Sequence, residues 1–143
     1  MAAFVEGNYV ALKVNVKEQR DLAKKLRVIW TPTVFAALPD GTVLHQTIGW
    51  LPPDDFIAEF GYGLARAALE QRDFESASRL LRDAVTKNPK HDRAPEAMYW
   101  LGVSEFRRTN GIDAAKVAWK ELAENWSGSA WATRVKWLVS RAE

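Results

Sequence analysis

The chain has 143 residues, of which 48% are hydrophobic and 27% are charged, proportions that are ordinary for a soluble globular protein. Its net charge of +2 is far below the dense positive charge of nucleic-acid binders, and no apolar run approaches the ~20 residues of a membrane span. Cysteine is absent, which excludes disulfides, thiolate nucleophiles and thiolate metal sites within this chain. We therefore expect a soluble, cytoplasmic protein that binds neither nucleic acid nor membrane.

The first third of the chain has the pattern of strands and one short helix. Alternation of apolar and polar residues predicts the strands, and the spacing of Leu22, Ala23 and Leu26 predicts a helix with one apolar face. A tight turn is expected at Asp40-Gly41, because glycine adopts a positive φ without steric cost. The predicted elements, in chain order, are a strand at residues 10–16, a helix at residues 19–26, and strands at residues 33–38 and 42–48.

From Pro53 onward the signals are helical. Proline suits the first turn of a helix, and Asp54 and Asp55 complement the positive end of the helix dipole. The pattern of residues 53–143 predicts five helices, the first of which leads out of the sheet.

The stretch RVIWTPT, residues 27–33, places a proline directly ahead of a predicted strand. Proline has no backbone N–H, so it cannot donate a hydrogen bond to a neighbouring strand. Together with the element order over residues 9–60, this arrangement resembles the C-terminal half of the thioredoxin fold. The resemblance implies that the Thr31–Pro32 peptide bond is cis and that the loop Trp30-Thr31-Pro32 binds extended peptides through the Thr31 backbone. The first strands and the C-x-x-C helix of that family do not precede this stretch, so the unit is expected to be truncated.

The complete thioredoxin fold has a central strand between those that correspond to residues 10–16 and 33–38. Without it, either residues 10–16 pair directly with residues 33–38 in a three-stranded sheet, or a second chain completes the sheet. Such a small sheet leaves apolar side chains exposed, at Val34, Phe35, Ile48 and Trp50. We therefore expect a homodimer whose contacts involve the incomplete sheet.

The helical half contains an internal repeat. Its two copies occupy residues 63–89 and 97–126, and each places small and large apolar residues in one register. Leu64 and Leu101 are equivalent and lie 37 residues apart, with the residues in excess of a ~34-residue unit falling in loops. The pattern resembles the tetratricopeptide repeat, in which small residues let antiparallel helices approach closely.

A closing amphipathic helix is expected at residues 129–141. It would cover the exposed face of the second helix pair. Trp119 and Trp126 should then pack near this helix, with its Trp131 and Val135 facing inward.

In tetratricopeptide proteins the first helix of each repeat lines a groove that receives peptide segments. The resemblance therefore implies a protein-binding groove, formed here by Tyr62, Arg66, Tyr99, Trp100, Val103 and Arg107. Aromatic and arginine side chains are the types enriched at binding hot spots. Tyr99 and Trp100 could equally serve the packing between repeats. The paired Lys and Asn residues of the family's carboxylate clamp are missing from the equivalent positions.

Catalytic constellations are hard to assemble from this sequence. His45 lies on a predicted strand and His91 in a polar linker, so both are expected to be solvated surface residues that form neither a metal site nor a triad. Asp54 and Asp55 are expected to cap a helix. We predict no catalytic residue, no metal and no cofactor.

The expected fold class is α+β and mostly α. A truncated thioredoxin-like β-α-β-β-α unit at residues 1–60 is followed by a tetratricopeptide-like antiparallel helical array with a capping helix at residues 61–143. The expected function is a non-catalytic protein–protein interaction module. The alternative is the partner-binding C-terminal part of a thiol-disulfide oxidoreductase of cell redox homeostasis, whose catalytic cysteines lie upstream of this chain.

Overall fold

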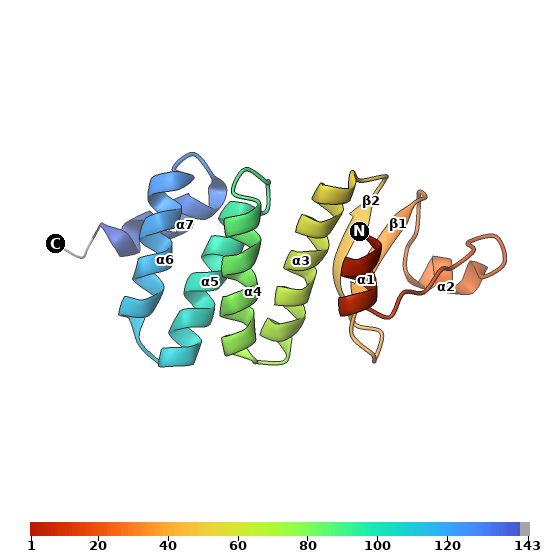
Figure 1. The fold of residues 1–143 in the computed structure, drawn as a ribbon, viewed down its shortest axis with the longest axis horizontal. Coiled ribbons are helices and arrows are strands. Elements are labelled where there is room, and N and C mark those ends of the chain that lie inside the picture. The colour runs from red at the N-terminus through yellow and green to blue at the C-terminus, as the bar shows by residue number, and fades with distance from the viewer. Residues whose placement is uncertain (141–143) are drawn as a thin grey trace.

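The structure is a computed structural model and describes residues 1–140. Within these residues a small antiparallel hairpin is followed by a row of helices, with the hairpin at one end and the C-terminal helix at the other (Figure 1). The elements are α1 (Ala2–Asn8), α2 (Arg20–Lys25), β1 (Thr33–Ala37), β2 (Val43–Ile48), α3 (Pro53–Glu70), α4 (Phe74–Lys87), α5 (Ala94–Thr109), α6 (Ile112–Asn125) and α7 (Ala130–Val139).

Strands β1 and β2 form the hairpin that the sequence predicts. Its turn depends on Gly41, which has a φ of 87°, and on the Asp40 carboxylate, which accepts the backbone N–H of Thr42 at 2.8 Å. The Thr31–Pro32 peptide bond ahead of β1 is cis. The Pro32 carbonyl accepts the N–H of Gly49 at 2.8 Å, which holds the two open ends of the hairpin together.

The prediction of a strand at residues 10–16 is wrong. These residues have no strand structure, and Val10 and Leu12 are 89% and 85% exposed. The sheet has two strands, not three, so no neighbouring backbone is available to residues 10–16. Because strand propensity reflects packing on a half-buried pleated surface, alternation without a partner strand does not suffice to form a strand.

Helix α3 joins the hairpin to the rest of the helices. Its hairpin-facing side has a glycine at the point of closest approach, where a Cβ on Gly63 would lie 3.4 Å from the Ala36 Cβ and 3.1 Å from the Tyr9 hydroxyl. That hydroxyl in turn donates to the Phe60 carbonyl. The small residue therefore brings α3, the hairpin and the segment after α1 into contact.

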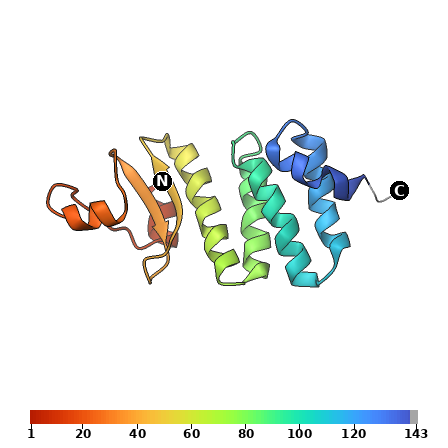
Figure 2. The same cartoon turned by 180° about the vertical axis from the view of Figure 1, so that it is seen from behind.

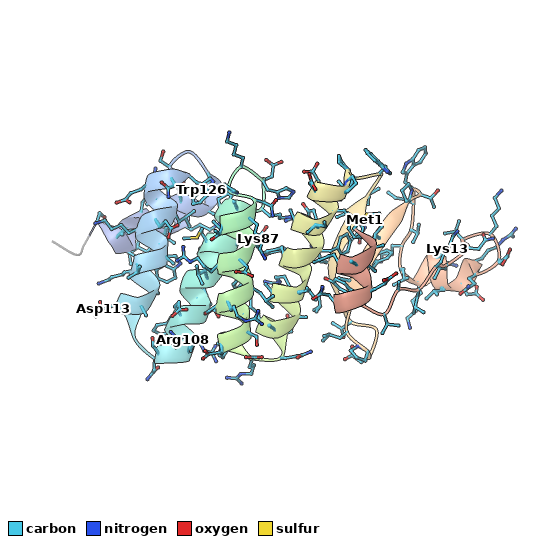
Figure 3. The ribbon with its side chains drawn as sticks, in the orientation of Figure 1. Met1, Lys13, Lys87, Arg108, Asp113 and Trp126 are labelled. Atoms are coloured by element: carbon cyan, nitrogen blue, oxygen red, sulfur yellow. The ribbon has the colours of Figure 1, made fainter. Side chains whose placement is uncertain are left out.

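The five helices predicted from Pro53 onward are confirmed within the described residues. Helices α3 to α6 run alternately up and down and α7 crosses them obliquely, so Lys87 and Trp126 lie at one end of the array and Arg108 and Asp113 at the other (Figure 3). Helices α5 and α7 lie in front of α4 and α6 in Figure 2, which places alternate helices in two layers. Helix α7 lies within the range 129–141 that was predicted for the closing helix. Arg141, the last residue of that range, lies outside the described residues.

The interior of the array depends on small residues in one helix facing large ones in the next. Ala77 and Ala115 are completely buried, as the repeat register predicts. Trp119 is only 7% exposed, and its indole N–H donates to the Tyr99 carbonyl at 3.1 Å. A Cβ on Gly102 would overlap the Trp119 ring, so α5 and α6 can approach only because residue 102 has no side chain.

The Gly102→Ala variant should lose about 1–3 kcal/mol of unfolding free energy, because the added methyl group forces the Trp119 ring to move. Gly61→Ala is the matched control. Gly61 also lies within a helix, and its added Cβ meets no atom within 4 Å, so this variant should keep or gain stability. Urea denaturation of both variants measures the difference, and equal stability of the two would contradict the packing of Trp119 on residue 102.

Candidate functional site

Helices α3, α5 and α7 present a surface on which arginine side chains lie on aromatic rings. The guanidinium of Arg66 lies 4.8 Å from the centroid of the Trp100 ring, and that of Arg134 lies 4.1 Å from the Trp131 ring. Arg107, on the same side of α5 as Trp100, lies 4.9 Å from the Phe74 ring. Such cation–π contacts keep each guanidinium near a ring, and its N–H donors can still bind acceptors.

The helical period places these α5 side chains on one side of the helix. At 3.6 residues per turn, Trp100, Val103 and Arg107 lie within about 60° of one another, whereas Leu101 and Arg108 are displaced from them by about 80° or more. Leu101 and Arg108 line a depression of about 500 Å³ shared with α4 and α6. We refer to the exposed side of α3, α5 and α7 that carries Arg66, Trp100, Val103, Arg107 and Arg134 as the inner face.

The structure brings most of the predicted groove residues together on the inner face. Arg66, Trp100 and Val103 are half-buried and Arg107 is exposed. The Trp100 indole N–H is enclosed and has no hydrogen-bond partner among the described residues. Tyr99 belongs mainly to the packing between repeats, since its ring lies 5.1 Å from that of Trp131.

Tyr62 differs from the other predicted groove residues because it is only 3% exposed. Its hydroxyl donates to Glu96 at 2.8 Å. Burial, followed by the nearby Glu96 carboxylate, raises the pKa of Tyr62 above its ordinary range, so the hydroxyl remains a donor. Tyr62 therefore contributes to the contact between α3 and α5, not to an open surface.

A buried ionic cluster lies where the hairpin meets the helices. Glu59 of α3 contacts three side chains from different segments: His45 of β2 at 2.6 Å, Arg93 at 3.2 Å and His91 at 3.9 Å. Arg93 also binds Glu96 at 2.8 Å. The cluster therefore links β2, α3 and the start of α5.

The prediction that His45 and His91 are solvated is wrong. His45 is 8% exposed, and the side chain of His91 is 15% exposed. Both are covered because α3 packs over the hairpin and brings Glu59 to them. Glu59 was missed as a functional residue, although its position four residues before Gly63 already placed an acid on the hairpin-facing side of the helix.

Desolvation opposes the ionisation of Glu59, but the hydrogen bond from His45 and the charge of Arg93 outweigh it, and the pKa of Glu59 is lowered from 4.5. The carboxylate is therefore ionised at neutral pH and stabilises the junction. No group of three or more His, Asp or Glu side chains in residues 1–140 is arranged to hold a metal ion.

The predicted peptide-binding loop Trp30-Thr31-Pro32 lies at the open end of the hairpin. All three residues are exposed, and within the described chain the Thr31 backbone groups make no hydrogen bond. Ile29, Trp30, Ile48 and Trp50 form an apolar patch there, with exposed fractions of 85%, 67%, 52% and 75%. Val34 and Phe35, expected to be largely exposed, are half-buried.

None of the helices in residues 1–140 combines the length and apolar composition needed to span a bilayer.

A family model described as tetratricopeptide repeat matches residues 62–130 of this chain. The match begins within α3 and ends at the start of α7, so it covers the helices that the sequence assigned to repeats. Residues 62–130 thus form a tetratricopeptide-like helical array. No curated protein matches the chain.

The Glu59→Gln variant should be less stable than the wild type at pH 7, and the difference should shrink as the pH falls. A carboxyl whose pKa is lowered by folding stabilises the protein above its unfolded value, near 4.5, and loses that contribution as the pH falls through its folded value. Urea denaturation at pH 7 and pH 4 measures this change. Glu70→Gln, at an exposed position of the same helix, is the control. A difference between wild type and Glu59→Gln that stays constant with pH would contradict the assignment.

Proposed function

We propose that this chain is a non-catalytic protein-interaction module whose inner face binds a segment of a partner protein. The observation that carries the proposal is the grouping of Trp100 and Val103 with Arg66 and Arg107, all within the residues that match the tetratricopeptide repeat, next to Arg134 on the helix that follows. Tryptophan and arginine dominate binding hot spots because they combine a large contact area with specific donors. Repeats of this kind generally mediate protein–protein contacts.

The inner face offers both apolar area and accessible polar groups. Val103 of α5 is half-buried, and Phe106, one turn further along the same helix, is 37% exposed. Arg66 of α3 reaches Trp100 of α5, and Tyr99 of α5 packs on Trp131 of α7, so a partner segment that crosses the inner face contacts successive helices. Such a segment gains contacts with each helix without needing a deep pocket.

A peptide-display selection on the full chain tests this function. Peptides that are recovered should lose binding to Val103→Arg, because a long charged side chain then occupies the middle of the inner face. Val117→Arg is the matched control, since Val117 is 68% exposed on the outer helix α6. Loss of binding in Val117→Arg but not in Val103→Arg would place the site on the outer layer and contradict the proposal.

A second candidate function belongs to residues 1–60, proposed as a truncated thioredoxin-like unit beside the helical unit at residues 61–143. In this alternative the chain is the partner-binding part of a thiol-disulfide oxidoreductase, and Trp30, Thr31 and Pro32 contact extended peptide. The specific support is the unpaired Thr31 backbone next to the exposed Trp30 ring. An added peptide strand could use those backbone groups.

We also propose that the open end of the hairpin associates with a second copy of the chain. Four large apolar side chains there are more than half exposed, and a two-stranded sheet leaves two edges unpaired. Light scattering at micromolar concentration should therefore give a dimer mass. Trp50→Asp should give a monomer, while Val117→Asp on the outer layer should remain dimeric. A monomeric wild type would refute the association.

A further inference from the structure

The arginines of the inner face have no carboxylate partners. Arg66, Arg107 and Arg134 come from three different helices, and in residues 1–140 none of them forms an ion pair. Each guanidinium instead lies on an aromatic ring, at 4.1 to 4.9 Å from the ring centroid. Their charge is therefore neutralised by no neighbouring acid.

The outer layer shows the opposite arrangement. Arg82 of α4 binds Glu121 of α6 at 2.6 Å, and Arg108 binds Glu105 at 2.7 Å beside the same depression. Further pairs join Lys87 to Asp83 and Lys116 to Asp113. Several basic side chains of α4 and α6 thus have an acidic partner, although Arg79 and Lys120 form no ion pair in residues 1–140, whereas none of the three arginines of the inner face has such a partner there.

Most acids of the inner helices are engaged elsewhere. Glu59 and Glu96 pair with Arg93, and Glu105 pairs with Arg108. Helix α7 contains no Asp or Glu at all. The exposed acids of α3 are Asp54, Asp55 and Glu70 at its two ends, and among the described residues none of them forms an ion pair with an arginine of the inner face.

The contact with aromatic rings suits the arginines to bind carboxylates. A guanidinium in contact with a ring has already lost part of its rotational freedom, so less entropy is lost when it forms a hydrogen-bonded pair. Its edge still offers parallel N–H donors that match the two oxygens of a carboxylate. Three such groups on adjacent helices fit a chain with several acidic side chains.

Resting on the function proposed above, we infer that the partner segment is an extended acidic peptide. Its Asp or Glu side chains pair with Arg66, Arg107 and Arg134, and its apolar side chains contact Trp100 and Val103. Three arginines are too few to give the phosphate contacts of a nucleic-acid interface, which favours a peptide.

The test uses three pools of fluorescein-labelled ten-residue peptides with the full chain. Alternate positions are drawn from Leu, Phe and Ala, and the others from Asp and Glu, from Asn and Gln, or from Lys and Arg. Fluorescence anisotropy should show that the acidic pool binds about tenfold or more tightly than the amide pool, with an affinity that falls as salt is raised.

Two triple variants with the same change in net charge locate the effect. Arg66→Gln, Arg107→Gln and Arg134→Gln together should abolish the preference for the acidic pool. Arg79→Gln, Lys87→Gln and Lys120→Gln, all at exposed positions of α4 and α6, should retain it. Circular dichroism establishes that both variants are folded.

The outcomes separate the inference from the function on which it rests. Equal binding of the acidic and amide pools, lost in Val103→Arg, would overturn the acidic preference and keep the interaction module. Equal losses in the two triple variants would show non-specific attraction and overturn the inference. Tighter binding of a labelled DNA duplex than of the acidic pool would also overturn it, and failure of every pool to bind would count against both proposals.

Discussion

Helix α3 has to fit two neighbours at once, because its one continuous length packs against the hairpin and against α4. On the hairpin side the contact requires a glycine, since Gly63 lies against Ala36 and the Tyr9 hydroxyl. On the other side Ala65 is completely buried in the core of the array. The position of α3 matters for the remaining structure, because Glu59 on this helix contacts both His45 of β2 and Arg93 at the start of α5.

The cluster around Glu59 forms because α3 packs between the hairpin and the start of α5. His45, His91 and Arg93 all contact the carboxylate of Glu59, whose side chain is 13% exposed. Contacts of this kind compensate the free-energy cost of removing the carboxylate from water. Residues 34 positions apart are brought together twice, as Glu59 with Arg93 and as Tyr62 with Glu96. Polar contacts thus join α3 to the start of α5, and Glu59 also contacts His45 of the hairpin at 2.6 Å.

The two layers of the array differ in how they treat charge and aromatic rings. On the outer side of the array, Arg82 of α4 and Arg108 of α5 each form an ion pair with a glutamate. On the inner face, Arg66 and Arg134 instead contact the rings of Trp100 and Trp131, while Glu96 pairs with Arg93 at the junction. Arginines on the two sides of the array thus have different kinds of partner.

The sequence by itself determined the features that depend on neighbouring residues in the chain. The turn at Asp40-Gly41, the start of α3 at Pro53 and the helical register that buries Ala77 and Ala115 could all be predicted, because backbone geometry, capping and periodicity are local properties. The candidate residues on α5 came instead from the resemblance to the tetratricopeptide repeat, which assigns the groove to the first helix of each repeat.

Only the tertiary structure decided the features that need a distant partner. Residues 10–16 have the alternation of a strand but no strand beside them, so they remain without regular structure. His45 and Tyr62 were assigned to surfaces and are buried, because Glu59 and Glu96 reach them from other elements. Such pairings depend on how α3 is placed against the hairpin and α5, and no local pattern of residues records that placement.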